Sequence, residues 1–132
     1  MSYNDIETAM VDYLTFKLPN YEIQGYPNSP ETYQFINPHA AILIKYTNSQ
    51  YANHSSRTQR LLINYEIHIL SRNLHGNDGY DLMELVRDTI TSLTIEGSKF
   101  YVINEEQYDY ADGVWYFRIR VALPFMRLNN GN

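Results

Sequence analysis

One segment, residues 61–70, limits the possible folds of this 132-residue chain more than any other. Its apolar side chains stand at every second position, and the positions between them are of mixed polarity. This period of two predicts a β-strand with one face toward a core and one mixed face. The residues on the apolar face are Leu61, Ile63, Tyr65, Ile67 and Ile69.

Four further strands are predicted elsewhere in the chain. A short strand is expected at 21–26, and the run at 40–46 is apolar on both faces at its start. Near the C-terminus we expect strands at about 99–105 and 114–124, separated by an acidic, tyrosine-rich stretch with an Asp-Gly turn signal. The apolar face of the last strand carries Trp115, Phe117, Ile119, Val121 and Leu123. Its other face carries Tyr116, Arg118, Arg120 and Ala122.

Two amphipathic helices are also predicted. The first opens the chain, is capped by Ser2 or Asn4 with an acidic side chain three residues on, and ends at Pro19-Asn20. Its stripe comprises Ile6, Met10, Tyr13 and Leu14. The second begins at Asp78 or Tyr80 and runs to about Leu93. Its stripe comprises Leu82, Leu85, Val86, Ile90 and Leu93.

The order of elements is therefore α-β-β-β-α-β-β. Because strands follow one another along the chain, this order favours a single α+β domain with an antiparallel or mixed sheet and both helices on one face. The stretch 27–38 contains three prolines and is predicted to be an extended loop. We expect the polar tail 129–132 to fray.

The segment 47–60 is polar and offers almost nothing to a core. Lying between two predicted strands, it is expected to form the loop of an extended hairpin whose tip does not pack on the core.

Composition excludes several kinds of site. The chain has no cysteine, which rules out disulfides, zinc-thiolate sites, iron–sulfur clusters and a cysteine nucleophile. No glycine-rich phosphate loop and no serine-nucleophile motif is present, so we expect neither an enzyme nor a bound cofactor. A net charge of −5 argues against a protein dedicated to duplex DNA.

The longest apolar run is far shorter than the ~20 residues of a membrane helix, and no secretory signal is visible, so a soluble, intracellular protein is expected.

A cation site is the main metal hypothesis that the histidines allow. His75 with Asp78 and Asp81 provides three candidate ligands, although the spacing matches neither a helical zinc site nor a calcium loop. The simpler interpretation is a turn at 76–79 in which Asp78 caps the second helix. We favour the turn and predict no metal.

Tyrosine and arginine suggest a protein interface. These two residue types are enriched at interfaces, because each combines contact area with directional hydrogen bonding. An ordinary solvated strand face is the alternative, and stacking on single-stranded nucleic acid is disfavoured by the negative charge. The candidate subunit interface comprises Tyr108, Tyr110, Tyr116, Arg118 and Arg120. A second group of these residue types lies in the polar segment and comprises Tyr51, His54, Arg57 and Arg60.

Three parts of the chain carry a resemblance to a known family: the opening helix 6–14 followed by Leu18-Pro19, the strand–loop–strand unit around 47–60, and the closing hairpin 112–121. In this order of elements the chain resembles the tail terminators of long-tailed bacteriophages, including minor tail proteins of Mu-like phages. The likeness spans nearly all of residues 1–132, as a single tail-terminator-like domain. This family has no catalytic residues to carry over.

The resemblance implies a homo-hexameric ring that caps the tail tube, sets tail length and then presents a surface to the head–tail connector. Its partners would be copies of itself, the tail tube protein and the connector, with no membrane and no sequence-specific nucleic acid binding. It would occur in the host cytoplasm during assembly and then in the virion tail. The segment 47–60 would be the docking loop, with Tyr51, His54, Arg57 and Arg60 as its docking residues, and it would order as it binds the tube. A joining or baseplate protein of the same particle, and an unrelated small binding module or enzyme, are the alternatives.

Overall fold

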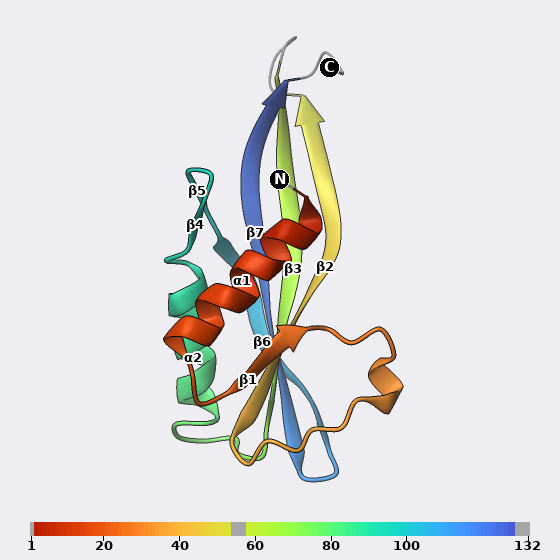
Figure 1. Ribbon diagram of the computed structural model, residues 1–132, viewed down its shortest axis with the longest axis vertical. Helices are drawn as coiled ribbons and strands as arrows, with labels where there is room; N and C mark the ends of the chain where they lie inside the picture. The colour runs from red at the N-terminus through yellow and green to blue at the C-terminus, as the bar shows by residue number, and fades with distance from the viewer. Residues whose placement is uncertain (1, 54–57, 129–132) are drawn as a thin grey trace.

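In the computed structural model, the described residues are 2–53 and 58–128. Two α-helices, one short 3-10 turn and seven strands are found in these two ranges (Figure 1). In chain order they are α1 (Tyr3–Lys17), β1 (Glu22–Gly25), η1 (Pro30–Thr32), β2 (Ala40–Asn53), β3 (Thr58–Ser71), α2 (Tyr80–Ile90), β4 (Thr94–Ile95), β5 (Ser98–Lys99), β6 (Tyr101–Ala111) and β7 (Val114–Leu128).

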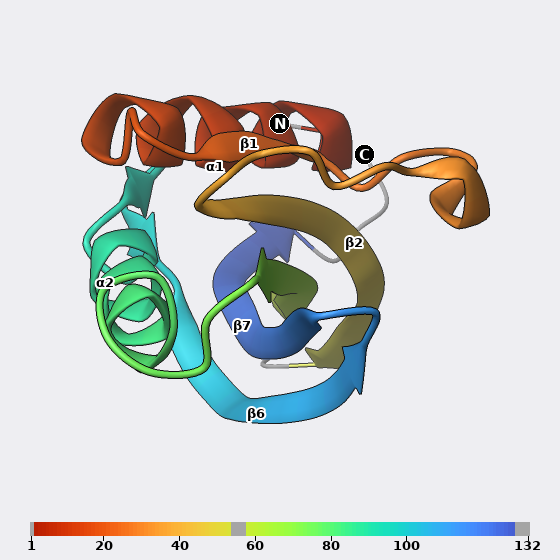
Figure 2. The same cartoon turned by 90° about the horizontal axis from the view of Figure 1, so that it is seen from below.

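The main sheet has five strands in the order β1-β2-β3-β7-β6. β1 runs parallel to β2 and every other neighbouring pair is antiparallel, so the sheet is mixed. Figure 2, which looks along the long strands, shows a curved sheet with α1 above β2 and α2 to one side. The predicted α+β class is confirmed. A separate two-stranded hairpin, β4–β5, was not predicted.

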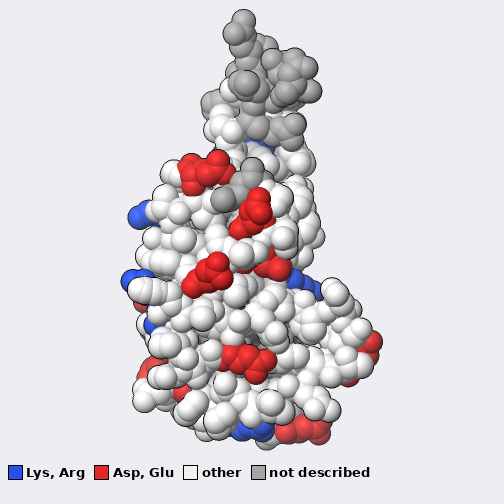
Figure 3. All heavy atoms as spheres, viewed as in Figure 1, with Lys and Arg blue, Asp and Glu red and all other residues white. Residues whose placement is uncertain are grey.

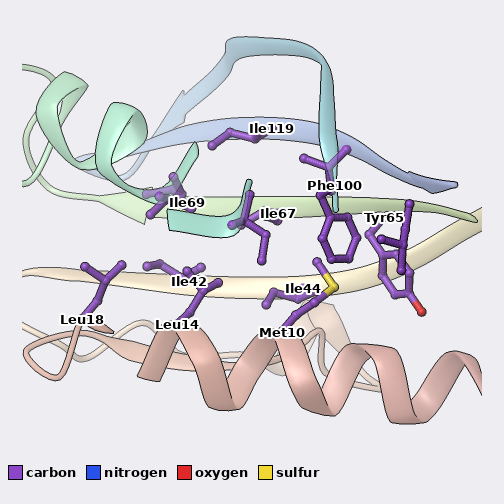
Figure 4. Packing of buried hydrophobic residues seen from close by; sticks show 14 of the residues in the cluster. Met10, Leu14, Leu18, Ile42, Ile44, Tyr65, Ile67, Ile69, Phe100 and Ile119 are labelled. Carbon is purple, nitrogen blue, oxygen red and sulfur yellow. The ribbon is translucent and has the colours of Figure 1, made fainter. Parts of the chain in front are cut away.

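One core lies between the helices and the apolar face of the sheet (Figure 4). The alternating apolar face of β3 is buried there from Ile63 to Ile69, as its period predicts. Each fully buried side chain of this size stabilises the fold by about 1.5–3 kcal/mol. The helices contribute two stripes at four-residue spacing: Ile6, Met10 and Leu14 from α1, and Leu82, Val86 and Ile90 from α2.

A second, smaller core covers the other face at one end of the sheet. Ala41 and Leu43 of β2 are buried there with Leu70 and Val114. The segment that follows β1 lies over them and supplies Tyr26, Tyr33 and Phe35. Because both faces of β2 are covered in this region, 40–44 is apolar without alternation, as predicted.

Local signals at the element ends are confirmed at several points. Ser2 and Asp5 form a reciprocal capping box at the start of α1, and the helix ends at Lys17, just before Leu18-Pro19. Asp112 and Gly113 both have positive φ, which is the requirement of a two-residue hairpin turn.

The prediction that 47–60 is a loop is wrong. β2 continues to Asn53 and β3 begins at Thr58, paired along their length through a bulge between Tyr46 and Asn48. Burial of side chains does not account for the distal part of β2. Its polar residues are held in register by backbone pairing with β3, which is itself paired with β7. His54 and Arg57 lie outside the described residues, as does the tail 129–132.

Three smaller expectations also need correction. The tyrosine-rich stretch after residue 105 is not a connection, since β6 extends through it to Ala111 against β7. The second helix ends at Ile90, and Leu85 of its predicted apolar stripe is exposed. Asp78 does not cap that helix: Gly79 occupies the cap position, and Asp78 instead accepts a hydrogen bond from the Tyr21 hydroxyl at 2.8 Å.

Candidate protein interface

The distal halves of β2, β3 and β7 form a three-stranded arm, defined here as residues 47–53, 58–64 and 122–128. Figure 1 shows this arm projecting beyond the start of α1 and beyond both helices. β6 reaches only as far as the pair Tyr101–Ala122, so β7 has no second neighbour further along the arm among the described strands. The arm is therefore a narrow sheet that the helices leave largely uncovered.

An open groove of about 620 Å³ lies at the base of the arm on its helix side. Tyr51 and Leu61, which face each other across β2 and β3, line it together with Phe125 and Met126 of β7. Tyr51 is 49% exposed and Met126 is 53% exposed. The groove is completed by Ser2, Tyr3, Ile63 and Glu96.

The first turn of α1 anchors the arm to the domain. The Tyr3 ring stacks on Tyr46 with 4.3 Å between ring centroids. The Ser49 hydroxyl lies 2.8 Å from the Tyr3 hydroxyl, and the buried Tyr65 hydroxyl donates to the Tyr3 carbonyl at 2.8 Å. These contacts fix the position of the groove relative to the core.

The predicted docking residues are distributed unevenly. Tyr51 lies in the groove, whereas Arg60 is exposed on β3 between Ala52 and Met126 in the ladder. Leu61, Phe125 and Met126 were not among the predicted site residues. A usable signal existed, because the apolar alternation of β3 begins at Leu61, before the part of the strand that the helices cover.

Most of the predicted subunit-interface residues meet on the sheet face opposite the helices. The Arg118 guanidinium forms an ion pair with Glu106 and lies 4.8 Å from the centre of the Tyr108 ring. Arg120 pairs with Glu66 at 3.3 Å, and Tyr116 packs at 6.0 Å from Tyr108. Both arginines therefore have a partner within the subunit.

Tyr110 does not join this group. It packs against Trp115, on the core side of β7, with 4.2 Å between ring centroids and an angle of 41° between the ring planes. A bulge between Gln107 and Asp109 separates the faces on which Tyr108 and Tyr110 lie. The assignment of these five residues to a subunit interface stays a prediction.

His68 sits at the centre of this polar face and is 5% exposed. Its Nε2 lies 3.0 Å from Glu66 and its Nδ1 lies 2.9 Å from the Tyr108 hydroxyl. Burial lowers the pKa of His68, and Lys45 and Arg118 act in the same direction, whereas Glu66 opposes them. The neutral ring satisfies both neighbours, since Nε2–H donates to the Glu66 carboxylate and Nδ1 accepts from Tyr108.

Because the pKa of His68 is lower in the folded chain than its ordinary value of 6.5, acid favours the unfolded state. The free energy of unfolding should be unaffected by His68 above about pH 7. It should fall as the pH drops through 6.5, with a slope of up to about 1.4 kcal/mol per pH unit. Urea titrations between about pH 7.5 and 5, above the range where carboxylates titrate, measure this slope. His68→Gln should flatten it and His75→Gln, at an exposed turn position, should not. An unchanged slope in His68→Gln would contradict this assignment.

The space around His68 is small. A cavity of about 100 Å³ is lined there by aromatic and apolar side chains together with His68. Ligand pockets usually measure about 300–1,000 Å³, so this cavity does not suit a drug-sized molecule.

The hypothetical cation site is not assembled. Asp78 bonds Tyr21 and lies 3.7 Å from His39, while His75 packs on the Tyr80 ring. Within residues 2–53 and 58–128, no group of three or more histidine, aspartate or glutamate side chains is placed to hold a metal ion. Over the same residues, no helix is long and apolar enough to cross a membrane.

The family described as Gp37 protein matches residues 10–132, which is nearly the whole chain. The chain belongs to the Gp37 family. Membership of the Gp37 family points to a phage-related, virion-associated protein. A search of curated proteins found no match.

Proposed function

We propose that this Gp37-family chain is a structural tail protein without catalytic activity, which forms a ring on the end of the phage tail tube and stops its growth. The ring would be a homo-hexamer, and it would present its outer side to the head–tail connector. The observation that carries the proposal is the three-stranded arm, with its half-exposed aromatic and sulfur-containing side chains beside a large groove.

The arm has the properties of a docking element. It projects away from both helices (Figure 1), so a partner reaches it without rearranging the core. Exposed apolar groups gathered beside a groove are typical of protein-binding surfaces. Tyrosine and methionine adapt well to a partner, because one offers a rigid ring with a hydroxyl and the other a flexible thioether.

Surface charge supports contact with protein rather than with nucleic acid. On the face that carries α1, acidic side chains are spread across the surface and basic ones lie mainly at its margins (Figure 3). Together with the net charge of −5, this face repels phosphate groups. A ring through which DNA passes without binding is compatible with such a charge distribution.

The docking role predicts a selective defect in the double variant Tyr51→Ser/Met126→Ser. Both side chains are about half exposed, so the fold should be retained while contact with the tube is weakened at least several-fold. Binding to purified tube protein and the length distribution of assembled tails measure the effect. We expect weaker binding and tails of irregular length.

Phe16→Ser is the matched control. Phe16 is an exposed aromatic residue on α1, away from the arm, and is 71% exposed. Removal of this ring should leave both tube binding and tail length unchanged. Equal defects in the two variants, or normal tails from the arm variant, would contradict docking by the arm. Localisation of the chain at the tail tip furthest from the head would instead assign it to the baseplate.

A further inference from the structure

The two sides of the sheet end in long open backbone edges. β1 covers only Ala41–Ile44 of β2, so from Lys45 onward β2 has only β3 beside it among the described strands. On the opposite side, β6 pairs only with β7. Figure 1 shows no described element beside the distal part of β2 on the side away from β3. Such edges present unpaired N–H and C=O groups to any strand that approaches them.

The two long edges, on β2 and β6, and the short distal edge of β7 beyond Ala122 are not equally protected. β7 carries Pro124 in its distal part, and proline cannot donate to an added strand. β6 is interrupted by bulges on either side of Asn104–Gln107 and carries three acidic residues. β2 has a bulge before Asn48, but from there to Asn53 it contains no charge, proline or bulge. Proteins normally block an exposed edge with one of these devices, so this stretch of β2 is an edge left available for pairing.

We propose that the β2 edge of one copy pairs with the β6 edge of the next copy, so that the sheet continues from subunit to subunit. This pairing rests on the ring proposed above and identifies its contact. Because the two edges lie on opposite sides of the sheet, the contact is head-to-tail. Repetition of such a contact closes into a ring when the rotation from one subunit to the next adds up to a full turn, as the proposed hexamer requires. Each subunit then covers both of its long edges, whereas a dimer through two β2 strands leaves both β6 edges open.

Charge also favours β6 as the strand that pairs with the β2 edge of the next copy. Residues 45–53 carry Lys45 as their single charge, whereas β6 carries Glu105, Glu106 and Asp109 and no basic residue. Glu105 and Glu106 are already ion-paired with Arg87 and Arg118 inside the subunit, so the repulsion between two paired β6 strands would come mainly from Asp109. The regular part of β6 is short, so the contact is expected to be weak between free subunits and to strengthen when a ring forms on the tube. Tyr108 and Tyr110, predicted interface residues, lie on this strand.

The absence of cysteine allows a direct test by cross-linking. Asn48→Cys and Gln50→Cys place a thiol on exposed positions of β2, and Asn104→Cys and Gln107→Cys do so on β6. Paired strands bring Cα atoms to about 4.5–5.5 Å, which is within disulfide range. Each β2 variant is mixed with each β6 variant, oxidised mildly, and compared with the same chains alone. Thr15→Cys, on the exposed side of α1, replaces the β6 variant in the control mixture.

We expect cross-linked dimer to be several-fold more abundant in at least one β2–β6 mixture than in either chain alone or in the Thr15→Cys control. A chain with both cysteines of that pair should give a ladder of products that ends at a closed ring. Rings that are visible by electron microscopy but lack this cross-link would overturn the strand pairing and leave the ring intact. Efficient β2–β2 cross-linking in a closed dimer would overturn both. Absence of the cross-link both from free chains at high concentration and from chains mixed with tail tubes would overturn the pairing, while tail assembly still tests the ring.

Discussion

Replacement of Tyr65 by alanine is expected to lower the free energy of unfolding by about 3–5 kcal/mol, the range for removing a buried aromatic side chain. Tyr65 is fully buried, and its ring contacts those of Tyr46 and Phe100 edge to face. Its hydroxyl donates to the Tyr3 carbonyl, so alanine also releases the start of α1. Since small domains are stable by only about 5–15 kcal/mol, this loss is a large part of the total free energy of unfolding, and urea denaturation measures it.

Two further variants separate the ring from the hydroxyl. Tyr65→Phe keeps the ring and removes one hydrogen bond, and it should cost about 1 kcal/mol. Tyr13→Phe removes an exposed hydroxyl that lies 2.7 Å from the Ser92 hydroxyl, and it should cost less. If Tyr65→Ala cost no more than Tyr65→Phe, the ring would not contribute to the core as described.

Gly79→Ala is expected to cost about 3 kcal/mol or more, at or above the upper end of the usual cost of overpacking. A Cβ at Gly79 would overlap the carbonyl of Leu74 and lie 2.7 Å from the backbone nitrogen of His75. The Leu74 carbonyl accepts the Tyr80 N–H at 3.0 Å, so it cannot move aside without breaking the start of α2. Thermal and urea unfolding of the variant measure the loss.

Gly97→Ala is the matched control. Gly97 has a φ of 82°, but no other heavy atom lies within 4 Å of the added Cβ. The control therefore reports only the strain of a left-handed backbone, about 1–2 kcal/mol. A smaller loss at Gly79 than at Gly97 would show that the Leu74–Tyr80 turn adapts, and the packing argument would fall.

Local patterns predicted the elements wherever one face of an element meets the core. The alternation at 61–70, the four-residue spacing of α1 and the Asp-Gly turn each correspond to a contact or a dihedral angle that the residue itself requires. The distal half of β2 gave no such signal, because its polar residues are held by a backbone ladder and bury little. Side-chain periodicity cannot report hydrogen bonds that any residue except proline makes.

The candidate interface was predicted only in part for a related reason. Tyr51 was recognised by residue type, but its groove partners Phe125 and Met126 lie about 75 residues later, and only the β3–β7 register brings them near Leu61. Arg118 and Arg120 were expected to face a neighbouring subunit. The acidic partner of Arg120, Glu66, belongs to β3, whose alignment with β7 is a tertiary property. The partner of Arg118, Glu106, lies just beyond the predicted end of its strand at about residue 105.

The amino-acid sequence alone was sufficient for the two helices and the hairpin turn, because each depends on neighbours within a few residues. It was also sufficient for the α+β class, which follows from the order of the elements, and for the exclusion of thiol chemistry, which follows from the absence of cysteine. The order of strands, the parallel β1, the projecting arm, the burial of His68 and the two open edges were decided by tertiary structure. Each of these depends on which segments, far apart along the chain, pair with one another, and that choice is made by the free energy of the whole sheet and its core.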